Sequence, residues 1–153
     1  PGFRFTVFTQ GCSHHCPGCH NPQTHDTSGG TEHTEEELLE RMRSNPLTDG
    51  LTLSGGEPFA QARDCAALAS GARQMGLDIW CYTGYTYEQL LQRAKDQGTE
   101  AQKALLRELD VLVDGPFLLE QRTLSLPWRG SRNQRVIDVP KSLENGDVVL
   151  FQP

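Results

Sequence analysis

The hydrophobic and polar positions along the chain follow two spacings, one typical of strands and one of helices. Apolar and polar residues alternate across 3–9, which predicts a first strand. Strand-like segments then recur along the rest of the chain. Short apolar runs predict strands at 51–53, 77–82 and 111–113, and 135–139 predicts a last strand before a short extended segment at 148–151.

Helix signals lie between these predicted strands. A capping box at Thr34 and Glu37 predicts a helix that ends near 45–46, because the two side chains satisfy backbone N–H groups at the helix start. Apolar residues at helical spacing across 62–75 predict a second helix. Two further capping boxes predict the starts of amphipathic helices, at Thr86 with Gln89 and at Thr99 with Gln102.

This order of strands and helices is typical of α/β proteins built around a parallel sheet. In such sheets, ligands bind at the carboxyl ends of the strands. A cysteine-rich loop follows the first predicted strand and a glycine-rich loop follows the second, so both loops reach that edge. We expect a single domain over 1–153, with a short N-terminal segment missing before it.

Charge and composition narrow the possible functions. The chain has 153 residues and a formal net charge of −6, so it lacks the basic surface that nucleic-acid binding requires. No apolar stretch has the length of a membrane span, and the first residues do not form a signal peptide. The 5 cysteines are an odd number, which favours a reducing compartment over a secreted disulfide framework. We therefore expect a cytoplasmic protein without nucleic-acid or membrane partners.

Three cysteines, Cys12, Cys16 and Cys19, lie close together in one loop. Thiolates at this spacing can bind one face of a cubane iron-sulfur cluster and leave one iron without a protein ligand. Zinc is the competing metal, because a histidine could complete a tetrahedral site, although the histidines lack the spaced second ligand pair of a zinc knuckle. Local composition leaves both metals open. The histidines concerned are His14, His15, His20 and His25.

The cysteine loop, combined with Gly55-Gly56-Glu57-Pro58 after the second strand, resembles the radical S-adenosylmethionine (SAM) superfamily. Within that superfamily, Pro1-Gly2 and Cys19-His20-Asn21 are similar to the glycyl-radical-enzyme activases. Further motifs resemble the activating proteins of anaerobic (class III) ribonucleoside-triphosphate reductases, over nearly the whole chain. They are Gly11-Cys12-x-His14-x-Cys16-Pro17-Gly18-Cys19, Trp80-x-Tyr82-Thr83-Gly84-Tyr85, Leu112-Val113-Asp114-Gly115-Pro116-Phe117 and Trp128-Arg129-Gly130-Ser131-x-Asn133-Gln134.

The resemblance implies a partial (β/α) radical-SAM barrel, open and shorter than a full TIM barrel. It implies that Cys12, Cys16 and Cys19 bind a 4Fe-4S cluster whose fourth iron is chelated by SAM. One electron from the reduced cluster would cleave SAM to methionine and a 5′-deoxyadenosyl radical. The radical would remove a hydrogen atom from a glycine of the partner, the large subunit of anaerobic ribonucleoside-triphosphate reductase. The electron would come from a reduced donor such as flavodoxin.

The same resemblance implies that the glycine-rich loop binds SAM. Gly55 and Gly56 would bring the backbone close to the methionine part of SAM, and Glu57 would accept a hydrogen bond from its ammonium group. Taken alone, these residues suit a plain strand-to-helix turn equally well.

Other candidate contacts to SAM lie in the cysteine loop and after two later strands. Backbone around Gly18, Cys19 and His20 would contact adenine, because Gly18 stands where the superfamily usually has an aromatic residue. Thr83 and Asp114 follow predicted strands and would contact SAM or a bound cation. A simple turn is the alternative explanation for Asp114, and a solvated loop position is the alternative for His20.

The polar segment 128–134 is the part that core packing explains least. Trp128 and Arg129 would dock the partner protein, and Arg129 or Arg132 could instead bind the carboxylate of SAM. A capped loop before the last strand is the alternative interpretation. The remaining candidates are predicted to be structural: His14 and His15 beside the metal ligands or in solvent, and Cys65 and Cys81 in the core.

Two other functions stay open from the sequence. The first is the same chemistry on another glycyl radical enzyme of the formate-lyase type, or on a small molecule. The second is a non-catalytic zinc-binding interaction module.

Overall fold

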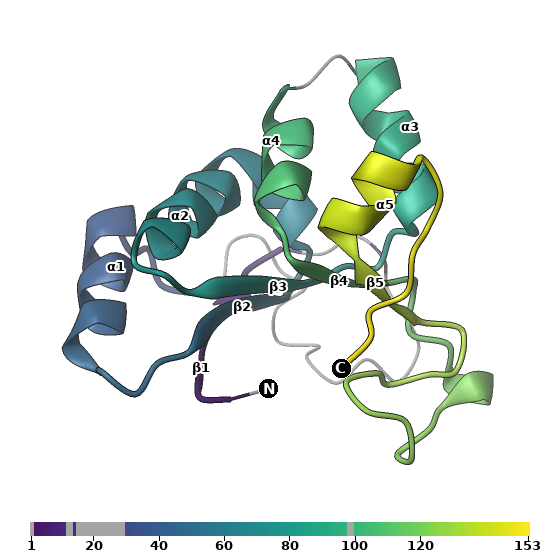
Figure 1. Ribbon diagram of the computed structural model, residues 1–153, viewed down its shortest axis with the longest axis horizontal. Helices are drawn as coiled ribbons and strands as arrows, with labels where there is room; N and C mark the ends of the chain where they lie inside the picture. The colour runs from purple at the N-terminus through teal and green to yellow at the C-terminus, as the bar shows by residue number, and fades with distance from the viewer. Residues whose placement is uncertain (1, 12–13, 15–29, 98–99) are drawn as a thin grey trace.

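The computed structural model describes residues 2–11, 14, 30–97 and 100–153 of the chain. Within these residues the chain forms a five-stranded sheet, and Figure 1 shows the helices α1 to α5 on one face of it. The strands are β1 (Arg4–Thr9), β2 (Gly50–Gly55), β3 (Asp78–Tyr82), β4 (Val111–Asp114) and β5 (Arg135–Asp138). The helices are α1 (Glu35–Ser44), α2 (Ala62–Gln74), α3 (Tyr87–Gln97), α4 (Glu100–Glu108) and α5 (Val139–Asn145), with short 3-10 helices at η2 (Pro58–Gln61) and η3 (Leu119–Gln121).

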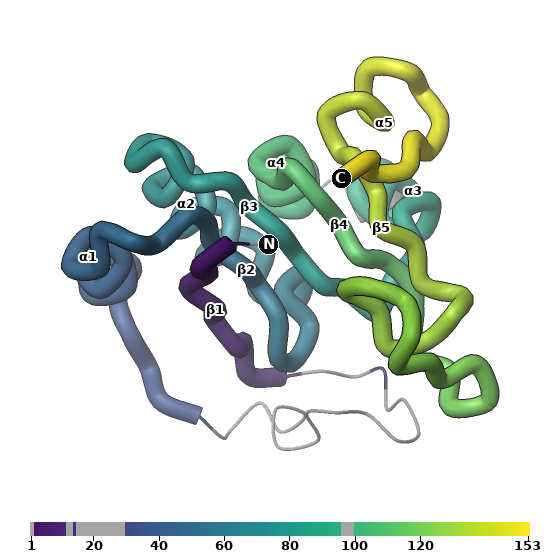
Figure 2. The backbone as a smooth tube through the Cα atoms, turned by 60° about the horizontal axis from the view of Figure 1, so that its bottom comes forward, coloured from purple at the N-terminus to yellow at the C-terminus, as the bar shows by residue number. Residues whose placement is uncertain are grey.

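The strands lie in chain order across the sheet, and β1 to β4 are parallel. This confirms the predicted α/β class. The sheet is not fully parallel, because its last strand, β5, is antiparallel to β4. The connection between these two strands contains only η3, so no long helix returns the chain to the other end of the sheet. The same carboxyl edge therefore carries the loops that leave β1, β2, β3 and β4 (Figure 2).

The predicted capping boxes explain where two helices begin. At α1, the Thr34 hydroxyl accepts a hydrogen bond from the Glu37 N–H at 3.1 Å. At α3, Thr86 and Gln89 bond reciprocally, with distances of 2.9 and 3.1 Å between side chain and backbone nitrogen. The start predicted at Thr99 lies outside the described residues.

Alternating side chains of the strands form two apolar clusters, one on each face of the sheet. Ile79 and Cys81 of β3 pack under the helices in the larger cluster, as do Leu51 and Leu53 of β2. Trp80 points the other way and packs with Val111, Val113 and Val136, against which Trp128 and Phe151 lie. Burial on both faces requires the continuous apolar runs that the sequence shows in the central strands.

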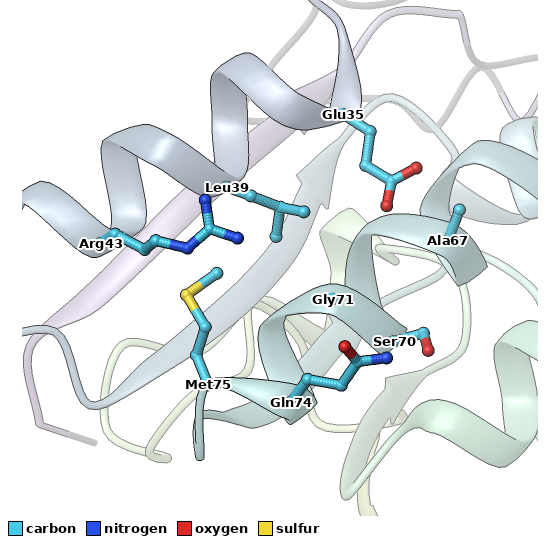
Figure 3. Close-up of a pocket in the computed structure, with 8 residues that line it drawn as sticks. All are labelled: Glu35, Leu39, Arg43, Ala67, Ser70, Gly71, Gln74 and Met75. Atoms are coloured by element: carbon cyan, nitrogen blue, oxygen red, sulfur yellow. The ribbon is translucent and has the colours of Figure 1, made fainter.

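Helices α1 and α2 line an open groove in the helix layer (Figure 3). Leu39 of α1 lies against Gly71 of α2, with Met75 nearby and Glu35 and Arg43 also lining the groove. None of the predicted site residues lines it. In the part of the chain that the structure describes, no helix is long and apolar enough to cross a membrane.

Candidate functional site

The described part of the candidate site lies at the carboxyl ends of the parallel strands. Gly55 ends β2, Thr83 follows β3 and Asp114 ends β4, so strand pairing brings these residues to one edge. The predicted cluster ligands and adenine contacts, namely Cys12, Cys16, Gly18, Cys19 and His20, lie outside the described residues.

The glycine-rich loop packs directly on the backbone that leads into the cysteine loop. Gly55 has φ +90°, and a Cβ on it would lie 2.5 Å from the Thr9 nitrogen. The Gly56 N–H donates to the Thr9 carbonyl at 2.7 Å, and the Glu57 N–H donates to the Gly11 carbonyl at 2.8 Å. The glycines are therefore needed for contact between the two loops, whether or not they also contact SAM.

Glu57 is the most densely bonded side chain of the site and is only 2% exposed. One carboxylate oxygen accepts from the Gly84 N–H at 2.8 Å and contacts the His14 Nε2 at 2.6 Å. The other accepts from the Phe59 N–H at 3.0 Å, and the Thr83 hydroxyl lies 2.9 Å from both oxygens. Glu57 thus joins the ends of β2 and β3 to the cysteine loop. Its predicted contact with SAM stays a prediction.

Thr83 is buried, and its hydroxyl belongs to this same network. Besides its bond to Glu57, the oxygen accepts from the Tyr85 N–H at 3.1 Å. The backbone N–H of Thr83 donates to the Val113 carbonyl at 3.0 Å. The hydroxyl orders the turn after β3, and its predicted contact with SAM or a cation stays a prediction.

His14 reaches Glu57 from the cysteine loop, a contact that the sequence did not predict. Its ring packs edge to face on Tyr85, with a centroid distance of 4.5 Å. Gly84 leaves room for the ring, because a Cβ there would lie 2.6 Å from the His14 Cδ2. The only signal in the sequence was the position of His14 between Cys12 and Cys16.

Asp114 forms a second buried network, beside the first. It is fully buried, and its carboxylate accepts from the Tyr87 N–H at 2.8 Å and from the Arg135 Nε at 3.1 Å. The pKa of Arg135 is raised, chiefly by its hydrogen bond to Asp114 and then by its bond to Glu88. The predicted contact of Asp114 with SAM or a cation stays a prediction, and in this structure its carboxylate binds groups of the chain.

The polar segment 128–134 ties the β4–β5 connection to the turn after β4. The Gln134 side chain donates to the Gly115 carbonyl at 3.0 Å and accepts from the Gly130 N–H at 2.9 Å. Asn133 donates to the Pro116 carbonyl at 2.8 Å. These amides satisfy backbone groups, which explains the polar residues at this end of the segment.

Trp128 and Arg129, the predicted docking residues, are both half-buried. Trp128 has φ 63° and packs on Trp80 and Phe151, with ring centroids 5.1 and 6.0 Å away. The Arg129 Nη1 lies 3.5 Å from the Gln134 carbonyl. Their contact with a partner stays a prediction.

Cys65 and Cys81 are buried in the larger core cluster, as the sequence predicted. Burial raises the pKa of Cys65 to about 12, and burial raises that of Cys81 well above its ordinary value. Both thiols therefore stay protonated at neutral pH, whereas thiolates are the form that binds metals.

The donor set of the loop suits an iron-sulfur cluster. Its three thiols are soft ligands, and the loop leaves β1 at the edge where Glu57 and Gly56 anchor its start. Among the described residues, which leave out these three cysteines, no group of three or more metal-binding side chains occurs.

Comparisons with known proteins agree with this chemistry. A family model described as a 4Fe-4S single cluster domain matches residues 1–137. The anaerobic ribonucleoside-triphosphate reductase-activating protein of Vibrio cholerae is 39% identical over 142 residues, which cover 88% of this chain and 86% of that protein. Proteins of the same name from Escherichia coli K12 and enterobacteria phage T4 are 35% and 37% identical. These alignments each cover 89% of this chain, and 88% and 84% of the two relatives.

Proposed function

The chain belongs to the 4Fe-4S single cluster domain family, with anaerobic ribonucleoside-triphosphate reductase-activating proteins among its relatives, and we propose that it activates such a reductase as a radical SAM enzyme. One observation carries the proposal. The backbone that leads into the cysteine loop, at Thr9 and Gly11, hydrogen-bonds directly to the glycine loop, and the two loops leave neighbouring strands. A molecule bound at the glycines would therefore lie beside a group bound by the cysteines.

Cys12, Cys16 and Cys19 would hold a 4Fe-4S cluster with one iron open to SAM. The bound cluster would supply the electron that cleaves SAM, so that a glycyl radical forms on the large subunit of the reductase. A reduced donor such as flavodoxin would deliver that electron. No nucleic acid or membrane takes part in this proposal.

Residues of the glycine-rich loop, the cysteine loop and the turn after β3 would bind SAM and order its site. Backbone at Gly55 and Gly56 would lie along the methionine part, while backbone around Gly18, Cys19 and His20 would contact adenine. Thr83 would keep the turn after β3 in place beside them, since its hydroxyl bonds Glu57 and the Tyr85 N–H.

The finer fold that we propose is a partial radical-SAM barrel, open at one side, over a single domain of residues 1–153. The chain order of β1 to β4 and the helices on one face of the sheet support it. An opening of this kind would admit a loop of the reductase, with Trp128 and Arg129 near the docking surface.

Removal of the cluster ligands tests the function most directly. Cys12→Ala, Cys16→Ala and Cys19→Ala, each reconstituted anaerobically with iron and sulfide, should lose the cluster, SAM cleavage and the glycyl radical on the reductase, because each change removes one of the three thiolates proposed to hold the cluster. Iron and sulfide analysis and electron paramagnetic resonance (EPR) measure these losses. Cys65→Ala, a change at a buried thiol of the core, is the matched control and should retain all three. A colourless wild-type protein that keeps stoichiometric zinc would contradict the proposal.

A further inference from the structure

His14 links the cysteine loop to the folded edge of the sheet. It stands between Cys12 and Cys16, and its Nε2 lies 2.6 Å from a Glu57 carboxylate oxygen. Glu57 is 43 residues further along the chain and only 2% exposed. Within the cysteine loop, this side chain provides a point of contact with the folded edge of the sheet.

The Glu57 carboxylate is saturated by donors from the chain itself. A carboxylate offers about four acceptor positions. Four groups bond to it here: the His14 ring, the Thr83 hydroxyl and the N–H groups of Phe59 and Gly84. Three of these donors belong to the folded sheet edge and one belongs to the cysteine loop. The sheet edge therefore leaves one acceptor position of the carboxylate for His14.

The His14 ring is also fixed on its other sides. Tyr85 packs against it edge to face, and the Arg93 guanidinium lies over the Tyr85 ring at 4.5 Å from its centroid. Gly84 has no side chain where the ring passes. A hydrogen bond, an aromatic contact and a close backbone contact leave the imidazole little freedom to move.

We propose that His14 is a positioning residue that fixes the cysteine loop against Glu57, and so sets the distance between the cluster and SAM bound at the glycine loop. The proposal rests on the proposed function. It gives Glu57 a further part as the anchor for His14, beside its predicted contact with SAM. The His14 side chain is 17% exposed, so water can replace its hydrogen bond when the ring is removed. Water would then satisfy the Glu57 carboxylate, but it would not hold the cysteine loop in place.

The test compares His14→Ala with His14→Gln, whose amide places a donor near the position of Nε2. His33→Ala is the matched control, because His33 contacts Glu37 at 3.2 Å in an exposed pair that does not involve Glu57. Each reconstituted protein is analysed for iron and sulfide. SAM is then titrated against the EPR spectrum of the reduced cluster, and urea unfolding of the metal-free proteins measures the fold.

We expect His14→Ala to keep its cluster and its unfolding midpoint. The SAM concentration that gives half of the EPR change should rise about tenfold, because the cysteine loop is no longer fixed against the glycine loop. His14→Gln should recover most of this loss, and His33→Ala should match the wild type.

Two results would overturn the inference while the proposed function stands. One is a His14→Ala protein whose SAM titration and EPR spectrum equal those of the wild type. The other is a loss in unfolding midpoint that accounts for the whole effect and is not recovered by His14→Gln. A wild-type protein that binds no cluster would instead contradict the proposed function, and with it the inference.

Discussion

Two buried carboxylates at the same edge of the sheet are satisfied in different ways. Glu57 follows β2 and is 2% exposed, and Asp114 ends β4 and is 0% exposed. Both accept from backbone N–H groups of the turn after β3 or the start of α3. Asp114 is completed by Arg135 of the neighbouring strand β5, whereas Glu57 is completed by His14 of the cysteine loop.

The two carboxylates have different roles because different parts of the chain supply their last hydrogen-bond partners. Arg135 is part of the sheet, so its bond with Asp114 stabilises the fold and fixes the antiparallel pairing of β4 with β5. His14 belongs to a segment that must also carry a metal group, so its bond with Glu57 couples that segment to the fold. A buried carboxylate at a strand end is therefore not by itself a sign of a ligand contact; the element that supplies its partner decides what it does.

Asp114→Asn should give the largest loss of stability. The amide would place a donor against Arg135 or the Tyr87 N–H, and breaking a buried pair on one side costs about 3 kcal/mol or more in free energy of unfolding. Urea unfolding of the metal-free protein measures the loss. Asp78→Asn is the matched control, because that aspartate is 48% exposed in its pair with Arg4 and should cost less than about 1 kcal/mol. Equal losses of unfolding free energy in Asp114→Asn and Asp78→Asn would contradict the difference expected between a buried and an exposed carboxylate.

Glu57→Gln should cost less stability than Asp114→Asn, but it should strongly lower SAM cleavage. One N–H group is left facing an amide donor, which costs about 1 to 2 kcal/mol in free energy of unfolding, less than Asp114→Asn costs. SAM cleavage should fall about tenfold or more, because His14 and the glycine loop lose their common anchor. The same unfolding assay and a SAM cleavage assay of the reconstituted protein measure both quantities. Glu37→Gln, in the exposed pair with His33, is the control. A Glu57→Gln protein with full SAM cleavage would show that both carboxylates serve the fold alone.

Local patterns predicted most of the elements, because alternation and capping act within a few residues. The bonds at Thr34 and Thr86 show this directly. The direction of β5 could not be predicted, since it depends on how amides at Asn133 and Gln134 fix the connection near Pro116 and Gly115. A polar segment of this kind looks the same in sequence whether it binds its own backbone or a partner.

The candidate site shows the same limit at longer range. The glycines and Glu57 were predicted as site residues from their motif, but their contacts join residues far apart in the chain. His14 and Glu57 are 43 residues apart, and Asp114 and Arg135 are 21 apart. Periodicity carries no information about such pairs, because packing of whole strands and loops brings them together.

Glu88→Gln should give the smallest effect, at the outer end of the Asp114 network. Glu88 is 60% exposed, and its carboxylate accepts from the Arg135 guanidinium, a bond that lowers the pKa of Glu88 from its ordinary value of 4.5. Solvent screening limits its contribution to less than about 1 kcal/mol. Because the folded state favours the ionised form, this contribution is present above the ordinary pKa and is lost as the pH falls through the lower, folded-state pKa. Unfolding midpoints of wild type and variant should therefore differ slightly at neutral pH and converge in acid. Equal midpoints at neutral pH would show that Asp114 and Arg135 do not need the charge of Glu88.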